Sequence, residues 1–400
     1  MSSKKILFIA LVIAFLVLSY KSGFSIPAFA RKYKVSCSTC HAPIPKLKDF
    51  GDEFAGNGFV MKDQEPRRSM IDTGDELLLL QRELPIAIRF DAYAQLKPDN
   101  DNGNVQNDLQ TPYILKILSG GRVTHNVSYY FYFFFSERGE VVGIEDAYLH
   151  FNDLFNQPFD VMVGQFQVSD PLFKRELRLT FEDYQVYRTK VGFVPSNLTY
   201  DRGLMITYST PWGSDFVGEI VNGNGIDPAD ENRQFDNDDF KNFVLRWTHG
   251  IGPVRIGAFG YYGETEHPDS LNNNVMMVVG PDVTINAGPF EMNFQYLWRS
   301  DDNPLYTDIK PINEIETKGG LAEVVYKPNG DDGRWFLIGL YNKVTSNIVD
   351  KLPGQSPIEY ESVGLTGTYL LGRNLRIMAE YNYDIEFEKN RFTIGFVSAF

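Results

Sequence analysis

The two cysteines of the chain and the histidine behind them are the residues best suited to bind a cofactor. Cys37 and Cys40 are the only cysteines among 400 residues, and His41 directly follows the second. Two thiols one helical turn apart can each form a thioether with a vinyl group of haem, and the adjacent imidazole can then bind the iron. The pattern predicts one covalent haem c, attached through Cys37 and Cys40, with His41 as the proximal iron ligand.

Two other kinds of site use the same cysteine spacing. A redox-active disulfide normally stands beside a βαβ unit, and a structural zinc site needs further cysteines or histidines at ligand spacing. The sequence has no strand–helix–strand pattern near Cys40 and no second cysteine pair. Because the histidine directly follows the second cysteine, haem attachment is favoured over both. We find no nucleophile–base spacing, phosphate loop or metalloprotease motif, so the sequence does not decide whether the chain is an enzyme.

Composition restricts the partners of the chain. The formal net charge is −14, which argues against nucleic acid and favours cations as ligands. Aromatic residues make up 14% of the sequence, with 31 Phe and 22 Tyr. The mean hydropathy is nonetheless −0.25. Rings in such number on a polar chain indicate strands that alternate between lipid and water rather than membrane helices.

Residues 1–25 have the pattern of a secretory signal peptide. Lys4 and Lys5 precede an apolar run from Ile6 to Leu18. A transmembrane helix needs about 20 apolar residues, so this run is short for a membrane span, and an uncleaved anchor is the alternative. Cleavage is expected after position 25 or after position 30. Export would bring the cysteines to the compartment where bacterial c-type haem is attached.

Residues 26–70 form a separate unit, a monohaem cytochrome c-like domain that is too short to bury a stable core without a crosslink. Pro43 and Pro45 delay helix formation after the histidine. A helix is expected next, because apolar side chains recur on one helical face at Leu47, Phe50 and Phe54. We expect these three side chains to lie against the porphyrin.

Glycines end this helix, and a methionine follows them. Gly56 and Gly58 supply the left-handed conformations that terminate helices, and Met61 is the first thioether that can return to the iron. We predict Met61 as the distal iron ligand, since a thioether favours reduced iron and raises the potential. Met70 is the competing ligand, and Met61 as a core residue is the other alternative. Residues 71–84 form a linker.

From residue 85 to residue 400 the sequence alternates between apolar and polar residues. Residues 290–299 show the pattern, with one face made of Phe290, Met292, Phe294, Tyr296 and Trp298. The other face is made of Glu291, Asn293, Gln295 and Arg299. One face suits lipid and the other water, so we predict an all-β fold, a transmembrane antiparallel β-barrel whose outer face contacts outer-membrane lipid. A soluble β-sandwich is the alternative.

Sixteen segments show this alternation, and sixteen is an even number, as bacterial outer-membrane barrels require. They are residues 85–97, 110–122, 126–137, 142–154, 159–169, 203–210, 215–223, 242–250, 253–263, 273–287, 289–299, 319–327, 334–344, 358–371, 374–385 and 390–400. Connections after even-numbered segments are short and those after odd-numbered segments are long and mostly acidic, as expected for periplasmic turns and outer loops. The last segment ends in Phe400 and is similar to the signal that the barrel-insertion machinery recognises.

The combination of a signal peptide, one C-x-x-C-H motif, a short haem unit and a sixteen-strand barrel resembles the monohaem cytochrome-porin fusions of bacterial outer membranes, which include iron-oxidising outer-membrane cytochromes. The local matches are residues 27–31, 37–41, 48–51 and 58–61. Residues 145–149 and 163–166 resemble strand pairs of porins in this group. The haem-unit match is specific in arrangement, whereas the barrel match is mainly architectural.

The resemblance implies that the haem unit plugs or caps the barrel, and that electrons pass between an extracellular donor, Fe(II) above all, and a periplasmic electron carrier. It also implies that residues 171–201, the third outer loop, fold into the lumen, where they would narrow the pore or pack against the haem unit; a solvated surface loop is the alternative. Three further functions stay open: a porin whose haem unit is a structural plug or redox gate, export of electrons to an external metal, and a peroxidase.

Two more groups of residues have side chains of metal-binding type. The outer loop near residue 230 carries carboxylates that would attract Fe(II), although a solvated surface is the simpler interpretation. They are Asp227, Asp230, Glu231, Asp236, Asp238 and Asp239. The remaining histidines, His125, His150, His249 and His267, have no paired ligand spacing and are expected to be structural or pore-lining.

Overall fold

The computed structural model describes residues 28–61, 70–71, 74–75, 80–81, 84–98, 106–236, 238–267, 272–308 and 314–400. The predicted signal peptide, residues 1–25, lies outside the described residues. None of the described helices is long and apolar enough to cross a bilayer.

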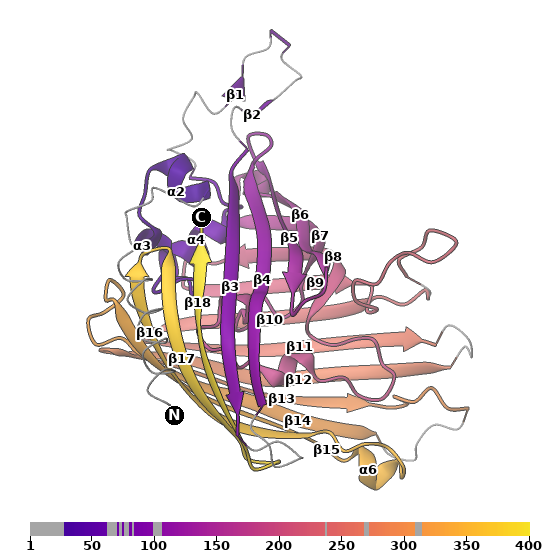
Figure 1. Ribbon diagram of the computed structural model, residues 1–400. Coiled ribbons are helices and arrows are strands. Elements are labelled where there is room, and N and C mark those ends of the chain that lie inside the picture. The colour runs from indigo at the N-terminus through magenta and orange to yellow at the C-terminus, as the bar shows by residue number, and fades with distance from the viewer. Residues whose placement is uncertain are drawn as a thin grey trace, which may run out of the picture.

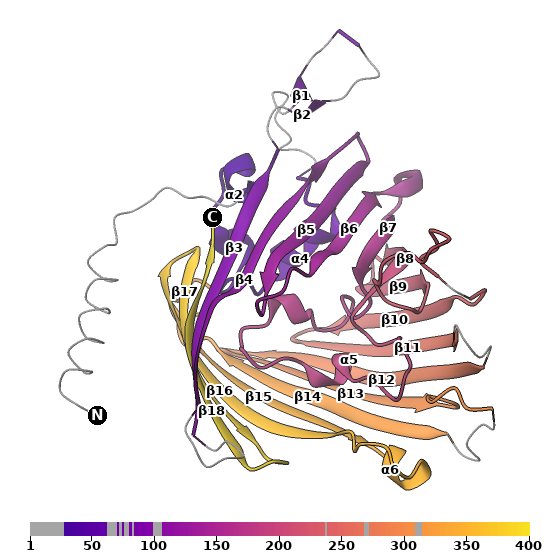
Figure 2. The same cartoon turned by 45° about the vertical axis from the view of Figure 1, so that its right-hand side comes forward.

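Sixteen antiparallel strands close into one barrel, in which the last strand, β18, pairs with the first, β3 (Figures 1 and 2). The strands are β3 (Ile86–Lys97), β4 (Gln106–Arg122), β5 (Val127–Glu137), β6 (Gly143–Phe151), β7 (Phe159–Gln167), β8 (Tyr200–Ser209), β9 (Ser214–Val221), β10 (Asn242–Ile251), β11 (Val254–Glu266), β12 (Asn273–Ala287), β13 (Phe290–Asp301), β14 (Ile315–Tyr326), β15 (Trp335–Ser346), β16 (Glu359–Gly372), β17 (Leu375–Asp384) and β18 (Lys389–Ala399).

The alternation of the sequence becomes the two faces of the barrel wall. In β13, Asn293 and Gln295 are 3% and 4% exposed, whereas Tyr296 and Trp298 are each 42% exposed. The polar side chains therefore face the lumen and the aromatic side chains face outward, as the period of two requires. This confirms the predicted assignment of the two faces.

The lengths of the connections distinguish the two ends of the barrel. The turns after β10 and β12 are tight, and each uses a glycine in the left-handed region, Gly252 and Gly288, both with φ of +58°. The connections at the opposite end are long, such as the one from β7 to β8. In outer-membrane barrels the end with short turns faces the periplasm.

All sixteen predicted strands are present, and their ends differ from the predictions by a few residues. The second barrel strand, β4, begins at Gln106 rather than at residue 110. The sixth barrel strand, β8, begins at Tyr200 rather than at residue 203. The predicted linker also contains structure, because β1 (Met70–Ile71) pairs with β2 (Leu80–Gln81). The extra residues at the strand ends are mostly polar, so they do not alternate between apolar and polar types. A prediction based on that alternation therefore does not include them.

The connection between β7 and β8, here called the lumen loop (residues 168–199), folds into the barrel as the resemblance implied. It carries a short 3-10 helix, η4 (Arg175–Leu177), and a short helix, α5 (Gln185–Arg188). Its side chains and backbone contact the inner wall from β14 to β18. Those contacts are Tyr184 Oη to Glu323, Asn342 to the carbonyl of Asp183, the amide of Phe181 to Glu380, and Arg391 to Glu182.

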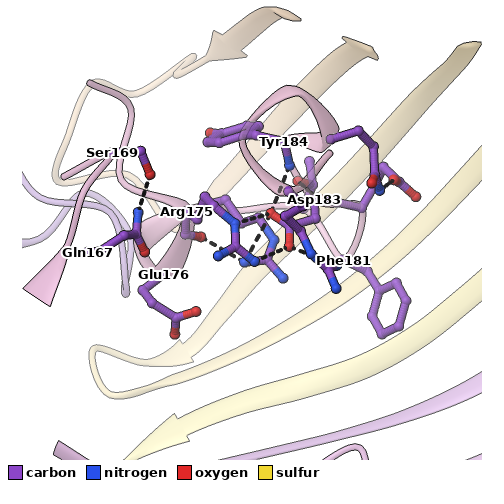
Figure 3. A network of polar contacts seen from close by, with 12 residues as sticks. Gln167, Ser169, Arg175, Glu176, Phe181, Asp183 and Tyr184 are labelled. Atoms are coloured by element: carbon purple, nitrogen blue, oxygen red, sulfur yellow. Dashed lines mark hydrogen bonds and ion pairs between the residues drawn. The ribbon is translucent and has the colours of Figure 1, made fainter. Parts of the chain in front are cut away.

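Buried ion pairs fix the shape of the lumen loop (Figure 3). Asp183 accepts two hydrogen bonds from Arg175, at 3.1 and 2.7 Å, and lies 3.3 Å from Arg188. Burial works against its charge, but the neighbouring guanidinium groups hold the pKa of Asp183 well below its usual range. The loop is therefore braced internally as well as against the wall.

The N-terminal residues 28–61, here called the plug segment, sit at the short-turn end of the barrel near the C-terminus (Figure 1). They form three short helices, α2 (Ala28–Tyr33), α3 (Cys37–Cys40) and α4 (Asp49–Gly56). The helix predicted after the prolines is confirmed as α4. Gly58 then adopts a φ of +66°, which ends the helical region as expected.

Candidate functional site

The predicted attachment cysteines occupy the two ends of one short helix. The helix α3 spans Cys37–Cys40 and is capped by Ser36, whose hydroxyl accepts a hydrogen bond from the Ser38 amide at 3.3 Å. Both thiols are free and half-buried. Burial raises the pKa of each thiol, so the cysteines stay protonated near neutral pH.

The imidazole of His41 is held by the backbone that follows it. Its Nδ1 lies 2.9 Å from the carbonyl oxygen of Pro45 and 3.3 Å from that of Lys46. A carbonyl only accepts, so Nδ1 carries the proton and Nε2 has its lone pair available. Burial lowers the pKa of His41, which keeps the ring neutral.

A close approach between α4 and α3 fixes the position of the second cysteine. The amide of Lys48 donates a hydrogen bond of 2.8 Å to the Cys40 carbonyl. A Cβ placed on Gly51 would collide with the same carbonyl oxygen. Only glycine allows this contact, so Gly51 is a structural requirement of the site that spacing alone did not reveal.

An aromatic cluster forms the core of the plug segment. Phe29 stacks on Phe59 with ring centroids 4.9 Å apart, and Phe54 meets Phe29 and Tyr33 edge-on at 5.5 and 5.6 Å. Of the three side chains predicted to share a helical face, Phe54 is buried in this cluster, whereas Phe50 is 41% exposed. The predicted apolar face of this helix is therefore only partly buried, with Phe54 in the core and Phe50 on the surface.

On one side the plug segment is bound to β13 by an ion pair. Lys46 Nζ lies 2.6 Å from Glu291 Oε1, and Lys327 lies 3.2 Å from the other oxygen of the same carboxylate. Burial opposes the charge of Lys46, but the nearby carboxylates, Glu291 first, raise its pKa to about 12. Lys46 thus stays charged at any physiological pH.

On the other side the plug segment packs against β5. Phe59 stacks on Tyr130 with ring centroids 4.5 Å apart. Gly58 lies so close to Ser128 that a Cβ at this position would collide with the Ser128 hydroxyl. Arg31 also donates a hydrogen bond of 2.6 Å to the carbonyl oxygen of Ile86 at the start of β3.

These contacts lie on opposite walls of the barrel. In the ring of sixteen strands, β5 follows β13 after eight steps, through β14 to β18 and then β3 and β4. The plug segment therefore bridges the lumen from wall to wall at the end with short turns (Figure 2). The sequence marked neither Lys46 nor Gly58 as a docking residue, because a lone lysine or glycine has no partner visible in a sequence pattern.

The lumen loop reaches the inner side of the plug segment. Lys174 Nζ lies 3.8 Å from Asp52 of α4, and Lys116 on β4 lies 3.0 Å from Glu176 of the loop. Burial opposes the charge of Lys174, but Asp170 and Asp52 raise its pKa. The loop thus contacts the N-terminal unit, which is one of the two arrangements that the resemblance implied.

The donor set at α3 fits a c-type haem. Two free thiols stand one helical turn apart, and the following imidazole is neutral with its Nδ1 proton already engaged. A hydrogen bond from the second ring nitrogen to a carbonyl is the usual way in which proteins orient a metal-binding histidine. Cys37, Cys40 and His41 would hold the group.

Met61 and Met70 occupy different parts of the chain. The Met61 amide donates a hydrogen bond of 3.2 Å to Tyr33 Oη, which in turn donates to the Phe59 carbonyl at 3.3 Å. This fixes the Met61 backbone beside α2, at the end of the plug segment. Met70 begins β1. The role of Met61 as distal ligand stays a prediction.

Some of the other histidines and acidic residues considered above are engaged in local contacts. His249 Nδ1 lies 2.8 Å from the Ser214 hydroxyl, and His150 lies 3.8 Å from Asp160. In the acidic outer loop, Asp236 pairs with Lys241 at 2.6 Å. Among the described residues, no group of three or more His, Cys, Asp or Glu side chains is arranged to hold a metal ion.

Comparison with known proteins gives a structural likeness only. No family model matches the sequence. No curated protein matches it. Several solved structures match the fold. The anion-selective porin from Comamonas acidovorans has 11% identity and a TM-score of 0.57 over 80% of this chain and 99% of its own. The outer membrane channel DcaP of Acinetobacter baumannii has 12% identity and a TM-score of 0.57 over 80% and 97%.

A third match is Salmonella typhi OmpF in complex with daunomycin, with 10% identity and a TM-score of 0.55 over 79% of this chain and 97% of the other. At these identities the likeness extends to the fold. The closed ring of sixteen strands, the short turns at one end and the loop inside the lumen agree with it. The chain therefore folds as a bacterial outer-membrane β-barrel of the porin type.

Proposed function

We propose that this barrel is an electron-transfer protein of the outer membrane, with one haem c attached to Cys37 and Cys40 and bound by His41. The observation that carries the proposal is the position of these residues. They belong to a segment that bridges the periplasmic mouth of the barrel, anchored on β13 by Lys46 and on β5 by Phe59. A c-type haem supplies a one-electron Fe(II)/Fe(III) couple when bound.

The location supports exchange with two compartments. A haem outside the membrane could not receive electrons across a hydrocarbon layer about 30 Å thick. At the periplasmic mouth it would be accessible to a periplasmic electron carrier, and the lumen would lead to it from the cell exterior. We propose Fe(II) as the extracellular electron donor.

One sector of the inner wall carries several carboxylates. Carboxylates of Glu145, Asp146 and Glu219 face the lumen between β6 and β9 and are buried there. Both carboxylate oxygens of Glu219 lack a hydrogen-bond partner among the described residues. These carboxylates would attract cations to this sector of the wall, whereas arginines and a lysine line the sector from β17 to β4. Fe(II) would pass along this wall rather than occupy a preformed site.

Each residue of the plug segment would have a defined role. His41 would present Nε2 to the iron, with its ring orientation set by the Pro45 carbonyl. The aromatic cluster around Phe54 would keep water from one side of the site. Lys46 would hold the segment in the mouth of the barrel through Glu291.

The test uses the full chain produced with the bacterial machinery for c-type haem attachment. Covalent haem in the wild type, detected after denaturation, and its loss when Cys37 and Cys40 are both replaced by serine, would support attachment. The oxidised protein is then mixed with Fe(II), and the reduced protein with Fe(III), while the Soret and α bands are followed. Absence of exchange in both directions would contradict electron transfer with iron.

A porin with a redox gate is the second candidate, because the plug segment and the lumen loop both lie across the channel. Solute flux into liposomes separates the two functions. Flux that changes with the oxidation state of the protein, with no electron exchange with iron, would favour the gate. A spectrum that indicates an open sixth coordination position on the iron would instead favour the peroxidase alternative.

A further inference from the structure

A polar cavity of about 330 Å³, including the part open to solvent, lies between the lumen loop and the wall of β3, β4 and β17. Three guanidinium groups and two carboxylates line it. They are those of Arg89, Arg178 and Arg376, and of Asp91 and Glu176. The proposed function uses none of them.

Arg376 is buried without a direct ion pair in the described part of the chain. It is 1% exposed and donates one hydrogen bond, of 2.8 Å, to the carbonyl of Leu179. Its Nε has no partner, and it forms no ion pair with any residue that the structure describes. The Nε of Arg178, on the same cavity, also lacks a partner. A buried charge without a partner is strongly unfavourable, so buried arginines are normally paired.

The carboxylates of the cavity are already occupied. Asp91 binds Arg89 at 2.7 Å, and Glu176 binds Lys116 at 3.0 Å. Arg178 has Asp183 at 3.7 Å. With three guanidinium groups and two carboxylates, the lining of the cavity carries one excess positive charge, and Arg376 is the guanidinium group without an ion pair among the described residues.

The acidic residue next along the inner face of β17 does not compensate this charge. Glu380 accepts hydrogen bonds from the Phe181 amide at 2.6 Å and from Thr366 at 2.8 Å, and it lies 3.3 Å from Arg391. Its oxygens are thus committed to the lumen loop and to β18. No carboxylate among the described residues therefore forms a direct ion pair with Arg376.

The cavity lies at the level of the plug segment. Arg376 pairs with Val397 and Val397 pairs with Asp91, so Arg376 and Asp91 face the lumen at the same height on β17 and β3. Arg373, in the periplasmic turn before β17, lies within electrostatic range of the Cys37 thiol, and Arg89 lies within that range of His41.

We propose that this cavity binds one carboxylate-like oxyanion through Arg376, with Arg178 as the second donor. Two sources could supply such an oxyanion. One is a propionate of the haem that the proposed function places on Cys37 and Cys40, and the other is a free anion from solution. The first source rests on the proposed function, and the second does not. Arg376 is then a positioning residue for the anion.

The test measures how acetate, exchanged for chloride at constant ionic strength, changes the unfolding temperature of the full chain in detergent, followed by circular dichroism. It compares the haem-loaded protein with the haem-free protein that carries serine at positions 37 and 40. Acetate should stabilise the haem-free protein. Arg376→Gln should weaken acetate binding at least tenfold, as expected for the loss of hydrogen bonds to a charged group, and Arg376→Lys should retain part of it.

Two controls keep the result interpretable. Arg391→Gln removes an arginine that is already paired with Glu182 and Glu380, so it should lower stability and leave the effect of acetate unchanged. Arg178→Gln tests the second donor if Arg376→Gln does not fold.

The outcomes separate the sources. Acetate stabilisation of the haem-free protein alone indicates that a propionate fills the cavity in the haem-loaded form, whereas stabilisation of both forms indicates a free anion. No acetate effect in the haem-free protein, or an equal effect in Arg376→Gln, overturns the proposal. If the wild type attaches no haem, the proposed function fails, and the acetate comparison still decides whether the anion site exists.

Discussion

The ammonium group of Lys46 lies 2.6 Å from a carboxylate oxygen of Glu291, and this ion pair joins the plug segment to the barrel wall. Glu291 also binds Lys327 at 3.2 Å, so the two partners are not equivalent. Lys46→Met leaves Glu291 paired with Lys327, whereas Glu291→Gln leaves Lys46 without its ion-pair partner and leaves Lys327 with Asp331 at 3.0 Å.

We therefore expect Glu291→Gln to loosen the plug segment more than Lys46→Met does. Removing one partner of a buried ion pair costs roughly 3 kcal/mol. Both variants should raise solute flux into liposomes and speed proteolysis within residues 28–61. Lys318→Met is the control, because its exposed pair with Glu316 contributes little. Equal flux in all three variants would show that the ion pair does not hold the plug.

Gly58 should tolerate no side chain, whereas Gly56 should. Gly58 has a φ of +66°, and a Cβ there would collide with the Ser128 hydroxyl, whereas a Cβ on Gly56 would meet nothing within 4 Å. The left-handed conformation alone costs a residue with a side chain about 1 kcal/mol. Gly58→Ala should displace the plug segment, seen as faster proteolysis, and Gly56→Ala should match the wild type. If Gly58→Ala resists proteolysis as well as the wild type does, the plug segment does not depend on its close contact with β5.

The mature chain should begin at Ile26, which corresponds to cleavage after position 25. Phe29 stacks on Phe59, and Ala28 is 2% exposed. Cleavage after position 30 would remove both residues from the core of the plug segment. Mass spectrometry of the exported protein measures the N-terminus directly. A mature chain beginning at Arg31 would mean that the cluster forms without Phe29.

Met61→Ala should lower the reduction potential of the haem-loaded protein and change its spectrum, because a thioether ligand favours reduced iron. A potentiometric titration measures the effect. Met277→Ala is a suitable control, since Met277 is 48% exposed on the outer face of β12. If the spectrum and potential of Met61→Ala match the wild type, Met61 is not the distal ligand and Met70 becomes the candidate.

Acid should release the lumen loop only at very low pH. Burial opposes the charge of Glu176, but Lys116 and the nearby arginines lower its pKa to about 2. Because this folded-state pKa lies below the ordinary value of 4.5, the stabilisation is complete above about pH 4.5 and is lost as the pH falls towards 2. Conductance in planar bilayers should thus stay low at pH 4 and rise near pH 2. Glu176→Gln should weaken this acid transition rather than remove it, because the pKa of Asp183 in the same loop is also lowered by its arginine neighbours. A wild-type transition near pH 5 would implicate another group.

Much of the barrel is predictable because its signal is local. A strand that separates lipid from water must alternate, so Tyr296 and Trp298 can be assigned to the outer face from the sequence alone. The glycines at residues 252 and 288 mark turns for an equally local reason. Strand ends such as Gln106 were missed because exposed polar residues extend the hydrogen-bonded ladder without alternating.

The plug segment shows where local patterns stop being sufficient. The spacing of Cys37, Cys40 and His41 predicts their chemistry, and the bond from His41 to the Pro45 carbonyl is itself a short-range contact. Helical periodicity placed Phe50 with Phe54, yet Phe50 is exposed. Its surroundings depend on where the barrel wall lies, which no helical pattern contains.

The sequence by itself determined the strand count, the two faces of the wall, the alternation of short turns and long loops, and the residues able to carry haem, since each depends on side chains that are neighbours along the chain. Only the tertiary structure decided that the plug segment spans the lumen from Glu291 to Tyr130, and that Arg376 lies buried without a direct ion pair to any described residue. Closing the ring brings together side chains that are far apart in the chain, and the cost or benefit of burying a charge depends on those neighbours.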